Sequence, residues 1–413
     1  MKKLFFQSFI IVFLFACDNP DPTTVVEPVV EPINDQPLGN SEDLQQAALD
    51  FSMDIFKEIM IEKSSDDNLL ISPLSIETAL YMTINGAQNN TLAEMHEALH
   101  LGSLNISGLN ENYKNLASNL VNTDMATLGL ANGIFYDTRM SVNDDFKERI
   151  TQNYNAIFEE LSFADPASVD YLNDWASEKT EGRITEILEE IDPEEVMFLI
   201  NALYFTGDWE TGFADYATHS GNFTKQNGKV LEVDIMHSDN PRSFFVDDQI
   251  EMVDLPFKGN EFSMSFIKTK GQSVTEWITG MDVSEFVSFY NDAFESKLQQ
   301  NRVYLNLPKF EISDHLLLKD ILVSMGIKDA FDENRADLHG LGSVGGNLYI
   351  SRVIHDSFLK IDEKGAEGAA VTVVAIAEES LPPALNFDEP FIFIIRHIET
   401  NTILFIGKMG DPS

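Results

Sequence analysis

The sequence predicts a mixed α and β domain over residues 41–413, behind an N-terminal region of a different character. Two observations support this class. Apolar residues recur at helical spacing from Ser41 onward, whereas from about Val196 they gather in short runs separated by turn residues, which is typical of strands. No internal repeat and no proline-rich linker divides residues 41–413, so we expect one large domain.

The composition excludes several classes of partner. The chain of 413 residues has 27 Lys and Arg against 68 Asp and Glu, a net charge of −41. Such a surface repels phosphate backbones, and the basic residues form no cluster beyond Lys2 and Lys3, so we expect no binding to nucleic acid or heparin-like chains. A single cysteine, Cys17, leaves no intrachain disulfide and no cysteine-based zinc site.

Residues 1–16 have the layout of a signal peptide, with two lysines, an apolar run over 4–16 and a small residue before the cleavage point. The run is too short to cross a bilayer, which takes about 20 helical residues. Residues 14–17, Leu-Phe-Ala-Cys, resemble a bacterial lipoprotein box and predict lipidation of Cys17. The alternative is an ordinary signal peptide followed by a chance cysteine.

Residues 17–40 predict an extended, solvated tether, because the segment contains prolines and acids but little apolar surface. Asp18 and Asp21, just after the lipidation site, resemble the acidic surface-export signals of some Gram-negative lipoproteins. We therefore expect a lipid anchor at the bacterial cell envelope, in the outer membrane or at the cell surface, that carries a globular domain.

The elements of this domain follow from local patterns. Ser41 supplies an N-cap, Glu42 and Asp43 suit the positive end of a helix dipole, and apolar side chains then recur on one face. Further helices are predicted over 76–85, 91–99 and 169–180. Strands are predicted over 198–205, 252–255, 262–267, 303–307, 353–361 and 391–398.

One candidate catalytic motif is the run from His96 to His100, which has the H-E-x-x-H pattern of zinc proteases. Histidines four residues apart share one face of a helix and can bind zinc, with Glu97 as general base. A third ligand would be needed, and Glu111 is a candidate without a helical pattern that recommends it. The alternative, which the pattern favours, is a solvent-facing helix that carries two histidines.

The most unusual segment is 365–376, GAEGAAVTVVAI, which begins with small residues and continues with β-branched ones. Read with a period of two, one face holds no charge and the other holds only Glu367, so the segment could be buried in a sheet. Pro382 and Pro383 cannot continue a ladder and end any strand before them. Composition alone favours an ordinary central strand.

Several motifs together resemble those of a serpin from about residue 41 to the end. Residues 198–209, FLINALYFTGDW, followed by Phe213, resemble the most recognisable strand of that family. Further matching motifs lie at 68–75 (NLLISPLS), 173–184 (NDWASEKTEGRI), 307–310 (LPKF) and 388–408 (from DEPF to GK).

The resemblance implies a serpin fold, an α+β architecture with a large mixed central sheet, additional sheets, surrounding helices and an exposed reactive-centre loop. It implies no enzymatic activity and no cofactor, but a monomeric suicide-type protease inhibitor. A serine or cysteine endopeptidase attacks the loop and forms an acyl-enzyme, after which the cut loop inserts as a strand and distorts the trapped protease. Insertion of about twelve residues, at roughly 0.5–1.5 kcal/mol per hydrogen bond plus side-chain burial, would release on the order of 10–20 kcal/mol. The native state is therefore expected to be metastable.

The hinge and the reactive bond are located by the family's spacing. Counting fifteen residues from Gly365 predicts Glu379–Ser380 as the scissile bond, with cleavage after Ala377 or Glu378 as alternatives. A glutamate before the cut indicates a glutamyl endopeptidase as target, with an elastase-like or papain-like protease as the fallback. The hinge residues carried over are Glu363, Gly365, Ala366, Glu367, Gly368, Ala369, Ala370, Val371 and Thr372.

Two further groups of residues are carried over by the resemblance. The shutter, a buried polar cluster that controls opening of the sheet, comprises Ser72, Ser75, Asn201 and His355. The breach, where the loop first enters the sheet, comprises Trp209, Phe213 and Lys309, and Lys309 is expected to pair with Glu363.

Two hinge positions depart from the inhibitory pattern. Gly368 stands where inhibitors usually carry alanine, and glycine weakens a strand by roughly 0.5–1 kcal/mol. Ala366 replaces the usual threonine or serine but remains small. No bulky residue or proline interrupts the hinge, which favours an inhibitor over a non-inhibitory serpin that acts as a binding protein. The zinc protease is the third alternative.

Overall fold

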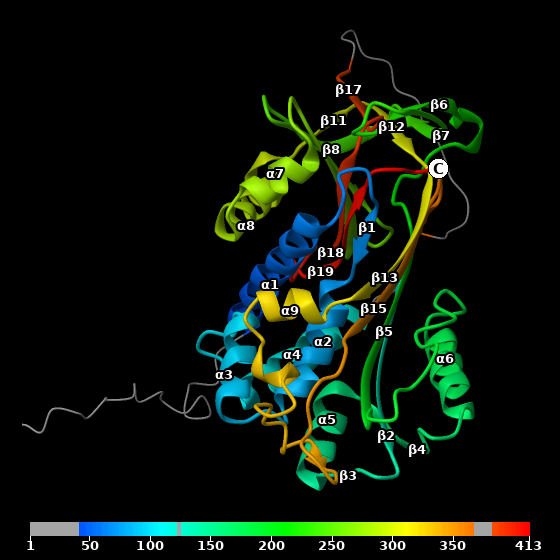
Figure 1. Cartoon of the computed structure of the whole chain (residues 1–413). Helices are drawn as coiled ribbons and strands as arrows, with labels where there is room; N and C mark the ends of the chain where they lie inside the picture. The colour runs from blue at the N-terminus through cyan, green and yellow to red at the C-terminus, as the bar shows by residue number, and fades with distance from the viewer. Residues whose placement is uncertain (1–40, 122–124, 367–381) are drawn as a thin grey trace, which may run out of the picture.

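The computed structural model describes residues 41–121, 125–366 and 382–413 (Figure 1). Within these ranges no helix has both the length and the apolar character needed to span a membrane. The α-helices are α1 (Ser41–Glu62), α2 (Pro73–Ile84), α3 (Asn89–Ala98), α4 (Ile106–Val121), α5 (Asp144–Tyr154), α6 (Ala167–Lys179), α7 (Val274–Gly280), α8 (Val283–Asp292) and α9 (Lys319–Ser324).

The largest sheet supplies most of the apolar core. Its strands β18 and β19 are buried at every position, and α1 packs against it with a buried apolar face. In order, the sheet comprises β1 (Leu69–Ile71), β19 (Ile403–Met409), β18 (Phe391–His397), β10 (Phe262–Thr269), β9 (Ile250–Pro256), β8 (Pro241–Val246) and β11 (Gln299–Arg302).

Three smaller groups of strands position the candidate site. The first, in order, is β16 (Gly365–Ala366), β5 (Met197–Asp208), β2 (Thr127–Asp137) and β4 (Ile157–Leu161). The second is the pair β13 (Phe310–Leu317) and β15 (Ile354–Ile361). The third is β17 (Ala384–Asn386), β12 (Tyr304–Pro308), β7 (Val230–Ser238) and β6 (His219–Thr224), while β3 (Ser141–Val142) pairs with β14 (Gly342–Ser343).

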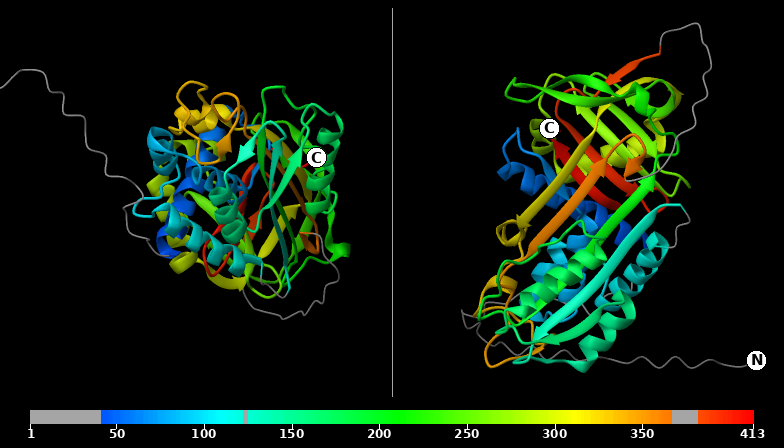
Figure 2. Two further views of the ribbon diagram at one scale, coloured as in Figure 1. Left: turned by 90° about the horizontal axis from the view of Figure 1, so that it is seen from below. Right: turned by 90° about the vertical axis from the view of Figure 1, so that its right-hand side faces the viewer.

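The long strands β13, β15, β5 and β2 run beside one another along the molecule (Figure 2, right). The helices α2 and α4 lie on one side of β5 and β2, and α6 lies on the other (Figure 1). In the antiparallel register of β2 and β5, Asn132 stands opposite Asn201. We refer to the group that contains β5 and β2 and to the pair of β13 and β15 as the two half-sheets. The first half-sheet lies between helical layers, and the end of β15 leads directly toward β16.

The predicted helices and strands are present, with ends that differ by a few residues. The helix predicted from residue 76 begins instead at Pro73, because the Ser72 side chain accepts a hydrogen bond from the Ser75 amide and proline suits a first helical turn. The strand predicted over 198–205 extends over the whole of β5.

Candidate functional site

Two residues of the predicted hinge, Gly365 and Ala366, belong to the sheet. Gly365 and Ala366 form β16, antiparallel to β5, with Gly365 opposite Asp208 and Ala366 opposite Gly207. Ala366 is buried, so these two positions differ from the exposed loop that the resemblance implied. The hinge residues Glu367 to Thr372 and the predicted bond between Glu379 and Ser380 lie outside the described residues.

Gly365 makes this entry possible because its backbone lies very close to β5. Its φ is +146°, a conformation that residues with a side chain rarely adopt, and an added Cβ would lie 2.1 Å from the Gly207 carbonyl oxygen. Glycine is therefore required where the chain turns from β15 into β16.

The predicted breach residues hold the segment that precedes β16. The Trp209 amide donates a hydrogen bond to the Lys364 carbonyl at 2.7 Å, and its indole Nε1 donates to the Asp362 carbonyl at 3.1 Å. The Phe213 amide donates to the Glu363 carbonyl at 2.8 Å. Trp209 and Phe213 are both buried, so the end of β5 fixes the backbone of the turn into the hinge.

The predicted ion pair stands at the same place. Lys309 Nζ lies 3.1 Å from Glu363 Oε2, and Thr218 Oγ1 donates to Glu363 Oε1 at 2.6 Å. Burial acts to raise the pKa of Glu363, but the hydrogen bonds from Thr218 and Lys309 outweigh it and lower this pKa. Because the Lys309 side chain is 36% exposed, solvent screening keeps the pair weak.

The predicted shutter residues connect three elements. The Ser72 amide donates to His355 Nε2 at 3.0 Å, which joins the start of α2 to β15. Ser75 Oγ donates to the Asn201 carbonyl at 3.5 Å, and Asn201 Nδ2 donates to Asn132 Oδ1 at 2.8 Å. The structure thus brings the four predicted residues to one place and adds Asn132, which no motif indicates.

His355 is neutral in this setting. Burial in the interior lowers its pKa to about 4, because a charged imidazolium would lose its hydration there. With Nε2 accepting from the Ser72 amide, the ring proton is carried by Nδ1.

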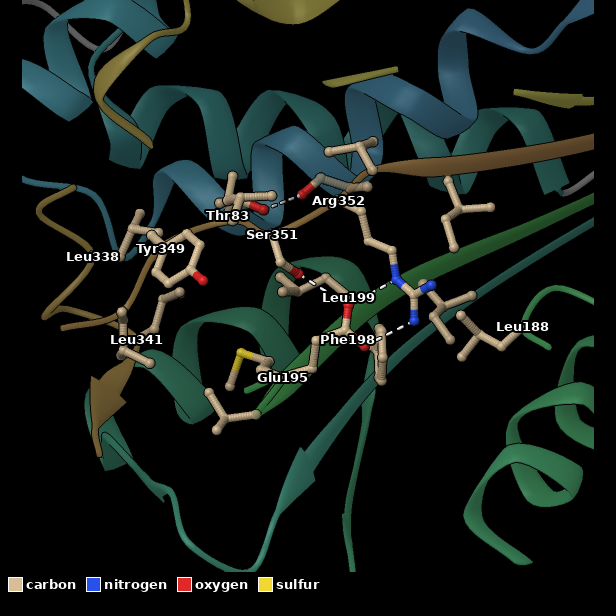
Figure 3. A pocket seen from close by; sticks show the side chains of 18 of the residues that line it. Thr83, Leu188, Glu195, Phe198, Leu199, Leu338, Leu341, Tyr349, Ser351 and Arg352 are labelled. Atoms are coloured by element: carbon tan, nitrogen blue, oxygen red, sulfur yellow. Dashed lines mark hydrogen bonds and ion pairs between the residues drawn. The ribbon is translucent and has the colours of Figure 1, made fainter. Parts of the chain in front are cut away.

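A cavity of about 930 Å3 separates β5 from β15 below β16. Phe198 and Leu199 of β5 and Leu188, from the segment after α6, line it together with polar groups from both borders (Figure 3). Ser75, Asn201 and His355 also line it, so the shutter residues lie in its wall. Along β5 it is lined by residues 197–202, so it occupies the part of the β5 edge farther from β16 on which a continuing strand would pair.

The structure does not assemble a zinc site from the H-E-x-x-H motif. His96 is buried and its Nε2 lies 2.7 Å from the Leu104 carbonyl oxygen, whereas His100 lies beyond the end of α3 with a φ of +53°, beside Asp54. The interpretation as a solvent-facing helix with two histidines is therefore also wrong for His96. In the part of the chain that the structure describes, no group of three His, Cys, Asp or Glu could hold a metal ion. The predicted lipidation site, Cys17, lies outside that part.

Comparison with known proteins decides the family. The family model "Serpin (serine protease inhibitor)" matches residues 46–412. The chain belongs to the serpin family. A leukocyte elastase inhibitor from Xenopus laevis is 31% identical over 382 residues, which cover 90% of this chain and 100% of that protein.

Solved serpin structures share the fold. The native state of tengpin, a thermophilic serpin, is 33% identical with a TM-score of 0.80, and the match covers 89% of this chain and 94% of that one. Thyroxine-binding globulin in complex with thyroxine is 25% identical with a TM-score of 0.79, over 89% of this serpin and 99% of that chain. Membership of the family and its inhibitory relatives support protease inhibition as the general activity, with a protease as partner.

Proposed function

We propose that this serpin is a suicide-type inhibitor that traps a serine or cysteine endopeptidase as a covalent acyl-enzyme. The observation that carries the proposal is the position of β16. Its two residues pair antiparallel with the end of β5, and a cavity lies beside residues 197–202 of β5, farther along the edge on which this strand would continue. A cleaved loop could continue this register and pair with both β5 and β15.

The protease performs the first half of ordinary peptide cleavage, which ends with formation of the acyl-enzyme. The nucleophile of the protease, a serine hydroxyl or a cysteine thiol, attacks the Glu379 carbonyl carbon, and its proton passes through the protease's general base to the departing Ser380 amino group. An ester or thioester to Glu379 remains. If insertion distorts the protease before water attacks this bond, the acyl-enzyme persists.

Incubation of the full chain with a glutamyl endopeptidase and, separately, with an elastase-like protease tests the proposal on a denaturing gel. We expect a band at the summed mass of the two proteins and a small fragment that begins at Ser380. A complex with another fragment would show that cleavage occurs elsewhere, after Ala377 or Glu378, and would still support the inhibitory function.

The variant Ala366→Arg provides a sharper test, because Ala366 is 1% exposed and an arginine there would block strand entry. We expect it to be cleaved without forming a complex. Ala384→Arg, at an exposed position of β17, is the matched control and should still form one. Cleavage of the natural chain by a broad protease panel without any complex would refute the inhibitor.

A second candidate function is that of a non-inhibitory binding protein. The observation that favours it is the similarity to thyroxine-binding globulin, a serpin crystallised with a small molecule. Under this alternative the loop is cleaved as a substrate, so the gel described above separates the two functions.

We also propose that the chain is a lipoprotein of a bacterial cell envelope, lipidated at Cys17 after removal of residues 1–16. The support is the leader sequence and the tether over 17–40. Labelled fatty acid should enter the expressed protein, and Cys17→Ser should abolish labelling and release the protein from the membrane fraction. Equal labelling of both forms would contradict lipidation at this residue.

A further inference from the structure

Two oppositely charged side chains join the lead-in segments of the two strands that border the cavity. Glu195 lies two residues before β5, and Arg352 lies two residues before β15. Arg352 Nη2 donates to Glu195 Oε2 at 2.8 Å, and Arg352 Nε lies 2.7 Å from Glu195 Oε1 (Figure 3). Ser351 Oγ also donates to Glu195 Oε1, at 3.0 Å. We refer to these contacts between Glu195 and Arg352 as the Glu195–Arg352 bridge.

The Glu195 end of the bridge is fixed to the half-sheet of β5 and β2. Its amide donates to the Asp192 carbonyl at 2.9 Å, and the Asp192 amide donates back to Glu195 Oε2 at 2.9 Å. Arg139, which follows β2, donates from Nη2 to the Glu195 carbonyl at 2.8 Å and from Nη1 to the Pro193 carbonyl at 2.8 Å. The carboxylate is therefore held in one position relative to β5.

The Arg352 end belongs to the other half-sheet. Arg352 Nη2 also donates to the Glu190 carbonyl at 2.8 Å, in the segment between α6 and β5. Apart from these contacts, β15 pairs with β13 and not with β5 in the described residues. The Glu195–Arg352 bridge is thus a direct connection between the half-sheets at the end of the cavity far from β16.

The register of β16 places this bridge on the path of a growing strand. Ala366 stands opposite Gly207, and Glu195 lies twelve residues before Gly207 in the chain. An antiparallel strand that continues without a slip therefore reaches Glu195 after twelve further residues. To pair on both sides it needs the two neighbouring strands about 9–10 Å apart along its whole length.

Opening the bridge is costly for the native protein. The Glu195 side chain is only 3% exposed, so it would lose its charged partner in an environment with little water to replace it. The planar guanidinium donates to both the Glu195 carboxylate and the Glu190 carbonyl, an arrangement that a lysine reproduces less well.

We propose that Glu195 and Arg352 are positioning residues that close the far end of the insertion path. The bridge holds the two half-sheets together in the native state and must open before the last residues of a cleaved loop can pair. The strength of the bridge therefore determines which fraction of acyl-enzyme complexes is trapped and which fraction is hydrolysed to release cleaved serpin. This inference rests on the proposed inhibitory function.

The test compares Glu195→Gln, Arg352→Met and the conservative Arg352→Lys with the natural chain, using the full protein and the same protease. We expect the first two variants to lower the number of serpin molecules consumed per protease trapped and to raise the insertion rate by roughly two- to tenfold, as a lost pair coupling of ordinary size predicts. Arg352→Lys should lie in between. Arg335→Met, which removes an exposed arginine from the Asp329 and Asp332 pairs, is the matched control and should leave both quantities unchanged.

Two readouts separate this inference from the proposed function. The gain of thermal stability after the loop is nicked by any protease reports insertion even when no complex forms. Suppose that the loop of the natural chain inserts but the chain traps no protease. The proposed inhibitory function is then refuted, and faster insertion in the bridge variants still supports the role inferred for Glu195 and Arg352. If the chain traps a protease and the variants show an unchanged or raised consumption ratio, the bridge does not oppose insertion and the inference is overturned. If nicking never raises stability, both fall.

Discussion

His355 shows how one side chain at this site makes the stability of the serpin depend on pH. The imidazole is neutral in the folded protein, with a pKa of about 4, whereas in the unfolded chain it titrates near its ordinary value of 6.5. Between these values the unfolded chain binds more protons, so stability is fully present above pH 6.5 and is lost as the pH falls toward 4. The loss amounts to about 3 kcal/mol at most.

We therefore predict that the fall in the free energy of unfolding between pH 7 and pH 4.5 is smaller in His355→Gln than in the natural chain. Glutamine can still accept the hydrogen bond from the Ser72 amide but cannot titrate. Denaturant unfolding at a series of pH values measures the difference. His219→Gln, a change at an exposed histidine, should follow the natural profile, and an identical profile for His355→Gln would contradict the assignment.

At the residue scale, the sequence predicts which residues belong to the site better than it predicts the residues that they contact. The shutter residues were found by resemblance, but Asn132 was not, because its role depends on the register that places it opposite Asn201. The Glu195–Arg352 bridge likewise joins residues far apart in the sequence. No sequence pattern points to Glu77 either, although it is buried on α2 and its Oε1 has no hydrogen-bond partner among the residues that the structure describes. Burial raises the pKa of this carboxyl well above the ordinary value.

At the scale of elements, the strands and helices follow from local patterns, but the start of the hinge does not. Small residues predicted that 365–376 could enter a sheet, and the resemblance placed this segment in an exposed loop. In the described part of this segment, Gly365 and Ala366 lie against β5, because hydrogen bonds from Trp209 and Phe213 fix the preceding backbone. Such tertiary contacts cannot be read from the period of a sequence.

We predict that Gly365→Ala weakens this short strand. The new Cβ would collide with the Gly207 carbonyl, so β16 must separate from β5 at a cost of about 1–3 kcal/mol. Thermal unfolding of the native protein should begin at a lower temperature, with faster proteolysis beside residue 366. Gly280→Ala, at the end of α7 with no atom near the added Cβ, should change stability by less than about 0.5 kcal/mol. Equal stability of both variants would show that β16 adds nothing to the native state.

At the scale of the whole molecule, the fold leaves a cavity between the strands β5 and β15, which do not pair with each other in the described residues. The sequence predicted the fold class because its motifs span most of the domain, and the family match over 46–412 agrees. What the sequence leaves open is how the two half-sheets are connected to each other. In the structure β5 and β15 belong to separate groups of strands, joined by the shutter at one level and by the Glu195–Arg352 bridge at another. In the proposed mechanism, a cleaved loop pairs along this gap and lowers the energy of the protein.

The last prediction concerns the free energy that pairing of a cleaved loop along β5 and β15 would release. Nicking the loop of the native serpin should raise its thermal unfolding midpoint by more than about 10 °C, because a new strand would pair along β5 and β15 and bury its apolar face. Circular dichroism during heating, before and after limited proteolysis, measures the shift. The nicked Ala366→Arg variant should show no such gain, because its strand cannot enter beyond β16. If the nicked natural protein unfolds at or below the temperature of the intact one, cleavage releases no pairing energy, and the native state is not metastable with respect to loop insertion.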